Sequence, residues 1–237
     1  MDRTEIAKKN VELVVSDSSR MNAYVARPQQ SGRYPGLLLF QEAFGVNHHI
    51  RSVSDRFAAE GYVVIAPELF HRTAPAGFEG SYADFSAVMP HMQALTPENI
   101  EKDVRSAYDW LHSNSQVNST DVSCVGFCMG GHVSFIANSI LPLRAAVSFY
   151  GGRIAPELLD RSSRLHAPIL LIWGGQDKHI PPEQRRAVTE ALTAAQKIYV
   201  NAEFSRADHG FFCDERASYE PHSARQAWAL TLEFLRS

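Results

Sequence analysis

The chain has 237 residues, of which 45% are hydrophobic and 21% are charged, and its formal net charge at pH 7 is −3. This length and composition predict one domain spanning residues 1–237, because a chain of this size commonly builds a single large α/β core. Positive and negative charges are scattered without blocks of one sign, which argues against nucleic acid or a membrane surface as a partner.

Targeting signals and cysteines indicate where the protein is expected to act and which kinds of site it lacks. No apolar run approaches the roughly 18 residues of a membrane-spanning helix, and the first residues lead into no signal-peptide core, so we expect a cytoplasmic protein. The three cysteines, Cys124, Cys128 and Cys213, are odd in number and form no CxxC pair. They argue against a disulfide framework and against a zinc site, and we expect neither a metal nor a cofactor.

Two apolar segments at the start of the chain, 11–15 and 21–27, flank the polar residues 16–20 and predict an edge hairpin. From residue 36 onward, short apolar runs alternate with helical patterns. The expected strands are 36–40, 63–66, 122–126, 145–149, 169–173 and 197–200, and the expected helices lie near 50–60, 98–113, 129–139, 183–194 and 221–235. Continuous apolar strands are typical of sheets covered by helices on both faces, so the pattern predicts an α/β fold with a mostly parallel central sheet.

Residues 67–96 break this alternation. Prolines and glycines punctuate a stretch that contains Phe70, Phe78, Tyr82 and Phe85. We predict a loop with a short helix over the functional site, because long connections inside compact domains are often functional. A surface insertion without a function is the alternative.

The most informative motif is Gly126-Phe127-Cys128-Met129-Gly130-Gly131, which follows the apolar run at 122–125. A sharp strand-to-helix turn exposes its central side chain and needs small neighbours, as in a nucleophile elbow. The amide of Met129 would then lie at a helix N-terminus, where it can hold an oxyanion or favour a thiolate. Cys128 is therefore the candidate nucleophile, although close packing alone would also explain such a glycine pair.

An acid and a base follow the nucleophile in the chain order of this motif class. Asp177 lies in the turn after the strand at 169–173, and His209 lies in the loop after the strand at 197–200. Imidazole titrates near neutrality and can take the thiol proton, while a buried carboxylate fixes its tautomer. We predict Asp177 as the orienting acid and His209 as the general base.

Each of these two residues has a competitor. Asp208 is too close along the chain to support its neighbour's ring easily, and His179 precedes the strand that should carry the base. Taken singly, Asp177 also suits a turn residue or a helix cap.

The second oxyanion donor is expected in the turn that follows the strand at 36–40, and we assign it to the backbone N–H of Ala43. The neighbouring Glu42 is unexpected, because a carboxylate beside an oxyanion site would repel the charge that the site must hold. A solvated carboxylate, or one paired with Arg51 or Arg72, is the alternative to a functional role.

Taken together, these motifs resemble the dienelactone hydrolase (carboxymethylenebutenolidase) family of α/β-hydrolases. The resemblance extends from about residue 10 to the end of the chain. Its motifs are Gln41-Glu42-Ala43-Phe44-Gly45, the cysteine elbow, Gly174-Gly175-Gln176-Asp177 with Ile180-Pro181, and His209-Gly210-Phe211.

The resemblance implies an α/β-hydrolase fold and cofactor-independent hydrolysis of a lactone or ester. Cys128, His209 and Asp177 would form the triad, with a thioester acyl-enzyme and an oxyanion held by the amides of Ala43 and Met129. It also implies that Glu42 contacts the resting thiol. Substrate binding would then move this carboxylate, so that the cysteine is deprotonated and turns toward the histidine.

One departure from the family concerns the substrate. The family binds a substrate carboxylate with two arginines, one of which lies four residues after the histidine, where this chain has Cys213. The family's second arginine lies in the segment between the second helix-flanked strand and the helix that follows it. In this chain, no arginine occurs between Arg72 and Arg105. Arg206 and Arg216 could substitute only at shifted positions. Without an arginine that binds a substrate carboxylate through two hydrogen bonds, the substrate could be a lactone, an ester or a thioester.

Aromatic residues suggest an apolar substrate pocket. The candidates are Phe44, Tyr82, Tyr150 and Phe211, although each of them could equally pack a loop. We expect a small-molecule lactone or ester substrate and a monomer or homodimer. A receptor that keeps the pocket without turnover is the alternative from another class.

Overall fold

The computed structural model describes residues 4–237. Its contacts divide the chain into two compact units, one ending at Ser123 and one beginning at Cys124. Strand β5 (Val117–Phe127) runs through this boundary, and all eight strands belong to one sheet. The interpretation of the chain as a single domain stays a prediction. Among the described residues, no helix has both the length and the apolar character needed to span a membrane.

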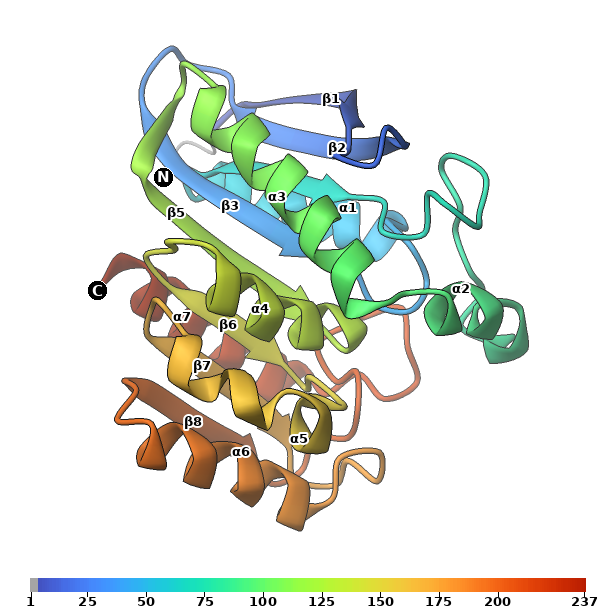
Figure 1. Ribbon diagram of the computed structural model, residues 1–237, viewed down its shortest axis with the longest axis vertical. Helices are drawn as coiled ribbons and strands as arrows, with labels where there is room; N and C mark the ends of the chain where they lie inside the picture. Colours follow the sequence, from blue (N-terminus) through green and yellow to red (C-terminus); the bar gives the residue numbers. More distant parts are fainter. Residues whose placement is uncertain (1–3) are drawn as a thin grey trace. The chain divides into compact units, whose positions relative to one another are not determined.

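The first unit holds strands in the order β1-β2-β4-β3 (Figure 1). Their bounds are Ile6–Val14 for β1, Arg20–Pro28 for β2, Val63–Pro67 for β4 and Tyr34–Phe40 for β3. β1 and β2 form the predicted antiparallel hairpin, β2 pairs antiparallel with β4, and β3 pairs parallel with β4. Helices α1 (His48–Ala59) and α3 (Pro97–Ser113) cover opposite faces of these strands (Figure 1).

Side-chain caps fix where these helices begin. The side chain of Asn47 accepts a hydrogen bond from the backbone of Ile50, and that of Thr96 accepts one from Asn99. Pro97 then occupies the first turn of α3, where a missing N–H costs nothing. Between β4 and α3, the chain forms a 3₁₀ turn, η1 (Phe85–Ala87), and the short helix α2 (Met89–Gln93), which confirms the short helix predicted in this segment.

The second unit continues the sheet in the order β5-β6-β7-β8, with every strand parallel to its neighbour. Its strands are β6 (Ala146–Phe149), β7 (Ile169–Gly174) and β8 (Tyr199–Phe204), and its helical segments are α4 (Met129–Ile140), α5 (Ile154–Glu157), η2 (Leu159–Arg164), α6 (Pro182–Ala194) and α7 (Pro221–Arg236). Helices α4 and α7 lie on opposite faces (Figure 1). A mostly parallel sheet with an antiparallel N-terminal pair is thus confirmed.

The predicted last strand, 197–200, overlaps the observed strand only at residues 199–200. Lys197 still belongs to the turn after α6, where its N–H bonds the carbonyl of Leu192, and β8 runs instead from Tyr199 to Phe204. The strand passes through Asn201 and Glu203, which look like loop residues in the sequence. An edge strand tolerates them because part of its surface faces water, as the exposure of both residues shows.

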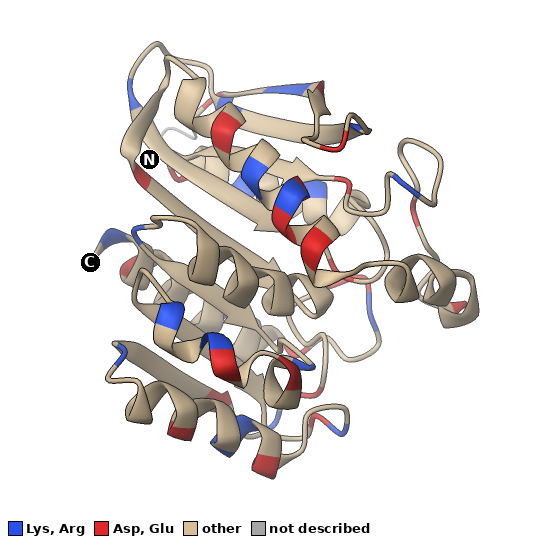
Figure 2. Cartoon of the chain, viewed as in Figure 1, with Lys and Arg blue, Asp and Glu red and all other residues tan. Residues whose placement is uncertain are grey.

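Charged residues of both signs lie along α3 and α6 (Figure 2). One of them, Asp103 on α3, is fully buried. The guanidinium of Arg72 donates to both of its oxygens at 2.8 Å and also reaches Asp17, while Nε2 of His71 lies 3.1 Å from Asp103 Oδ1. This network fixes the segment after β4 to α3 and to the turn of the hairpin.

Replacing Asp103 tests this network. Asp103→Asn should lower the free energy of unfolding by about 3 kcal/mol, because removing one partner of a buried ion pair leaves the other uncompensated. Urea unfolding measures the change, and Glu98→Gln on the exposed side of the same helix is the matched control, with little expected effect. A loss below about 1 kcal/mol for Asp103→Asn would contradict the assignment, since that is the range of exposed pairs.

Candidate active site

Cys128 lies between β5 and α4, at the turn predicted as an elbow. Its backbone has φ 55° and ψ −115°, a conformation that non-glycine residues rarely adopt. A Cβ atom at Gly126 would lie 1.9 Å from the carbonyl oxygen of Gly130, so the turn closes only with glycine there. Met129 is the first residue of α4, and its N–H therefore belongs to the turn that lacks intrahelical acceptors.

The three predicted triad residues lie together in the second unit. His209 Nε2 is 3.0 Å from Cys128 Sγ, and His209 Nδ1 is 2.8 Å from Asp177 Oδ2. The other oxygen, Oδ1, accepts the backbone N–H groups of His179 and Ile180 at 2.8 and 3.2 Å. Asp177 thus combines a turn function with the support of the imidazole ring.

Neither competitor replaces these residues. The carboxylate of Asp208 accepts the backbone N–H of His209 at 2.7 Å, while the ring of His209 bonds Asp177. The ring of His179 lies edge-on to that of His209, with centroids 5.2 Å apart, and on an exposed part of the loop. His179 therefore borders the base without taking its position.

The turn that carries Asp177 packs directly against the loop that carries His209. A Cβ atom at Gly174 would lie 2.6 Å from the carbonyl oxygen of Ala207, and one at Gly175 would lie 2.7 Å from Ser205 Cα. Gly175 N–H also bonds the carbonyl of Phe204, and Gln176 N–H bonds that of Ala207. The two loops are thus joined through their backbones.

Arg185, in the first turn of α6, is a contributor that the sequence did not reveal. It is buried, its Nη1 donates to the carbonyl of Gly174 at 2.5 Å, and its Nη2 lies 3.7 Å from Glu203. A lone arginine on an amphipathic helix reads as a surface residue, so no signal in the sequence pointed to this contact.

Electrostatics follow from this geometry. Burial lowers the pKa of His209, but the Cys128 thiolate charge and the hydrogen bonds to Asp177 and Cys128 raise it more strongly, to about 10. Burial raises the pKa of Asp177, yet the hydrogen bond and charge of His209 outweigh burial, so this pKa lies below its ordinary value. The imidazole of His209 is therefore protonated near neutral pH.

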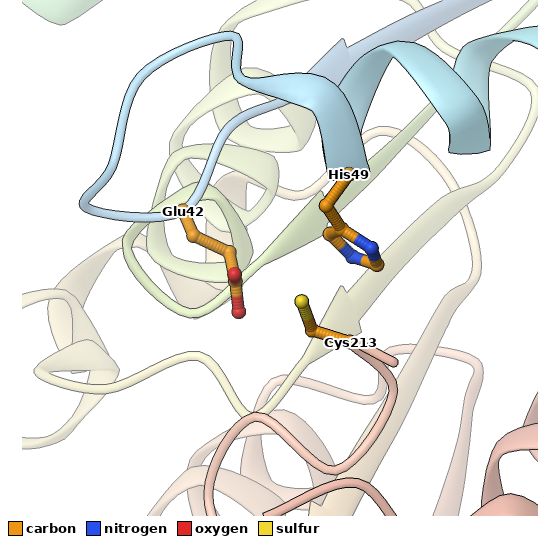
Figure 3. Close-up of side chains that lie close together, drawn as sticks. All are labelled: Glu42, His49 and Cys213. Carbon is orange, nitrogen blue, oxygen red and sulfur yellow. The ribbon is translucent and has the colours of Figure 1, made fainter. Parts of the chain in front are cut away.

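In the first unit, the turn after β3 contains Glu42 and Ala43, which are both buried. Glu42 lies in the loop and His49 in the first turn of α1, with their ligand atoms within 4.8 Å of one another (Figure 3). Arg51 and Arg72 were the suggested partners of Glu42.

Both guanidinium groups have other partners in the described residues. Arg51 donates to the Glu79 carboxylate and to the carbonyl of Val46, each at 2.7 Å. Arg72 belongs to the Asp103 network described above. Arg51 binds Glu79 and Arg72 binds Asp103, two carboxylates that spacing along the sequence does not identify as partners.

The candidate pocket residues form two aromatic pairs. Phe44 and Tyr82 pack edge-on with ring centroids 4.6 Å apart in the first unit. Tyr150 and Phe211 pack at 5.6 Å in the second, and the Tyr150 ring lies 5.1 Å from that of His209. Tyr150 and Phe211 are fully buried, so they support the site more than they offer an open surface.

The structure also shows the burial of the other two cysteines and of the two arginines near His209. Cys124 is fully buried, and burial raises the pKa of its thiol to about 12, as suits a packing residue. Cys213 is buried on the loop after His209. On this loop, the guanidinium of Arg216 lies against the backbone of Gly210, whereas Arg206 is exposed.

Comparisons with known proteins agree with this fold. The profile of the Dienelactone hydrolase family matches residues 21–237. A "Putative carboxymethylenebutenolidase" of Escherichia coli (strain K12) is 35% identical over 235 residues, covering 94% of this chain and 84% of the relative. One with the same name from Synechocystis is 32% identical over 230 residues, covering 93% of both chains.

A solved structure extends the likeness to three dimensions. The crystal structure titled "Putative Dienelactone Hydrolase from Klebsiella pneumoniae subsp. pneumoniae MGH 78578" superposes with a TM-score of 0.87 at 30% sequence identity. The match covers 98% of this chain and 99% of that chain. The predicted α/β-hydrolase fold is thereby confirmed.

The imidazole of His209 offers a direct test of the site's electrostatics. We expect it to titrate with a midpoint near pH 10 in the intact protein. Cys128→Ser should lower this midpoint by about 1 to 3 pH units, because it removes the opposite charge beside the ring. NMR of the ring nitrogens measures the midpoint. Cys124→Ala removes a thiol from the core of the same unit and should leave the midpoint unchanged; an equal change in both variants would refute the ion pair.

Proposed function

Because the chain belongs to the dienelactone hydrolase family, we propose that it hydrolyses a small lactone or carboxylic ester with Cys128 as the nucleophile. The observation that carries this proposal is the hydrogen-bonded series from Cys128 Sγ through the ring of His209 to the carboxylate of Asp177. An activated thiol requires such an arrangement, because the imidazole takes the thiol proton and the carboxylate orients the imidazole.

In the proposed acylation step, the Cys128 thiolate attacks the carbonyl carbon and the carbonyl electron pair moves to oxygen. The N–H groups of Met129 and Ala43 are the proposed donors to this oxyanion. Its collapse breaks the bond to the leaving oxygen, which takes the Nε2 proton of His209, and a thioester remains on Cys128. Asp177 stabilises the imidazolium ring throughout.

In the proposed deacylation step, a water molecule attacks the thioester carbonyl while Nε2 of His209 accepts its proton. The tetrahedral intermediate then expels the Cys128 thiolate, and the carboxylic acid product leaves after losing its proton. Both proposed steps use only side chains and backbone amides of this chain together with water.

Glu42 is proposed to control the thiol before substrate arrives, as the family resemblance implies. The distance of 3.0 Å between Cys128 Sγ and His209 Nε2 supports a thiol that can reach the base once Glu42 releases it. The burial of Glu42 supports a role inside the protein rather than a solvated one.

The substrate class is proposed at the level of small lactones and esters. The family's arginine after the histidine is Cys213 here, and the guanidinium of Arg72 is bound by Asp103 and Asp17. A thioesterase or small-ester carboxylesterase is therefore the nearest alternative. A non-catalytic receptor remains the alternative from another class, and cytoplasmic location and a monomer or homodimer remain predictions.

A substrate panel tests the activity. We expect turnover of at least one member among a dienelactone, neutral lactones, p-nitrophenyl acetate and a small thioester. Cys128→Ala should reduce the rate at least about a thousandfold, because removal of a triad nucleophile leaves only the residual contributions of binding and the oxyanion site. Cys124→Ala is the control thiol. Saturable binding of the panel without turnover would establish the receptor instead.

Glu42→Gln tests the proposed control of the thiol. We expect the pH dependence of Cys128 alkylation by iodoacetamide to change while thermal unfolding stays the same, because the variant removes a charge but little volume. Glu79→Gln, which loses an exposed carboxylate bound to Arg51 in the same unit, is the control. An alkylation profile identical to that of the unaltered protein would reduce Glu42 to a structural residue.

A further inference from the structure

The turn that carries Ala43 is hydrogen-bonded at both ends to residues 67–96, which we call the insertion. At one end, Oε1 of the buried Gln41 accepts the backbone N–H of Leu69 at 3.0 Å. At the other, the carbonyl of Phe44 accepts the N–H of Gly80 at 3.0 Å. The insertion therefore fixes the backbone on either side of Ala43.

The insertion also lies in direct contact with this turn. Gly45 has φ +81°, and a Cβ atom there would lie 2.2 Å from the carbonyl oxygen of Phe78. Ala43, Phe44 and Val88 form a buried cluster against which Phe78, Tyr82 and Met92 pack. Side chains of the insertion therefore pack directly against the turn that carries Ala43.

One side-chain hydrogen bond connects the insertion to the end of the turn. Asn47 uses Oδ1 to accept the N–H of Ile50, which caps α1, and uses Nδ2 to donate to the hydroxyl of Tyr82 at 2.8 Å. The Tyr82 ring meets Phe44 edge-on at 4.6 Å. Tyr82 therefore contacts the turn twice: its hydroxyl binds Asn47, which follows the turn, and its ring packs against Phe44 in the turn.

We propose that Tyr82 is a positioning residue for the oxyanion site, acting through Asn47 and Phe44 on the Ala43 N–H. The inference rests on the proposed function, in which that N–H binds the oxyanion. An oxyanion donor stabilises the transition state only when it is held where the charge develops. A more mobile turn should therefore reduce this stabilisation and leave the reactivity of the Cys128 sulfur unchanged. Tyr82 is thus assigned a role other than that of a substrate contact.

Two reactions of Cys128 separate this role from a purely structural one. Acylation by p-nitrophenyl acetate creates an oxyanion, whereas alkylation by iodoacetamide displaces iodide at a saturated carbon and creates none. Tyr82→Phe should slow the burst of p-nitrophenolate about tenfold, a fraction of the loss seen when a whole donor is removed. The alkylation rate at the same pH should remain that of the unaltered protein.

Variants of Asn47 provide the matched test. Asn47→Ser keeps a helix cap but loses the donor to Tyr82, and should slow acylation as Tyr82→Phe does. The double variant should be no slower than either single variant, because both remove one interaction. Asn47→Asp can accept from the Tyr82 hydroxyl and should retain most of the acylation rate. Tyr34→Phe, which loses only an exposed hydrogen bond to Gln30, is the control.

Each contrary result has a separate meaning. A normal burst in Tyr82→Phe, additive losses in the double variant, or an equal fall in the alkylation rate would overturn the positioning role. Absence of turnover of every member of the substrate panel by the unaltered protein, or release of p-nitrophenolate that survives in Cys128→Ala, would instead overturn the proposed function on which the inference rests.

Discussion

The close contact between the turn at Gly174-Gly175 and the loop at 205–208 is the constraint on which the second unit's site depends. Strands β7 and β8 are parallel, and their last paired residues are Gly174 and Phe204, so both loops leave the sheet at the same edge. Parallel pairing brings the loops together but does not set their distance. The absence of side chains at the two glycines does so, because it allows the backbones to hydrogen-bond. With both loops fixed, the Asp177 carboxylate and the His209 ring meet at 2.8 Å.

The same edge of the sheet also holds two residues with positive φ, Cys128 and Tyr150. Such conformations cost on the order of 1–3 kcal/mol each and persist only where the surroundings enforce them. Here the enforcement comes from the next strand: Cys128 N–H bonds the carbonyl of Phe149, and Tyr150 N–H bonds that of Ile172. Each bond continues the parallel pairing beyond the end of a strand. The strained backbone is thus held by the sheet, and both the sulfur of Cys128 and the ring of Tyr150 lie next to the imidazole of His209.

Patterns that arise from local geometry were readable in the sequence. The elbow, the order of the later strands and the hairpin follow from glycine spacing and apolar runs, and the structure confirms the strands and their parallel order. Interactions that depend on tertiary contacts were not readable. The bonds of Arg72 to Asp103, of Arg185 to Gly174 and of Tyr82 to Asn47 each join residues whose spacing follows no helical or strand period. The end of β8 was missed for a related reason, since only its pairing with β7 shows that polar residues belong to the strand.

The charge of the sulfur explains how one histidine could serve both steps of the proposed reaction. With a thiolate beside it, His209 has a pKa raised to about 10 and stays protonated near neutrality, so it starts acylation as an acid with a proton ready for the leaving group. Formation of the thioester removes the sulfur's charge, which is the largest of the causes that raise this pKa. Burial, which lowers it, then has more weight, and the ring becomes able to accept a proton from water. In the proposed reaction, acylation would therefore convert the acid into the base, with Asp177 holding the ring in both steps.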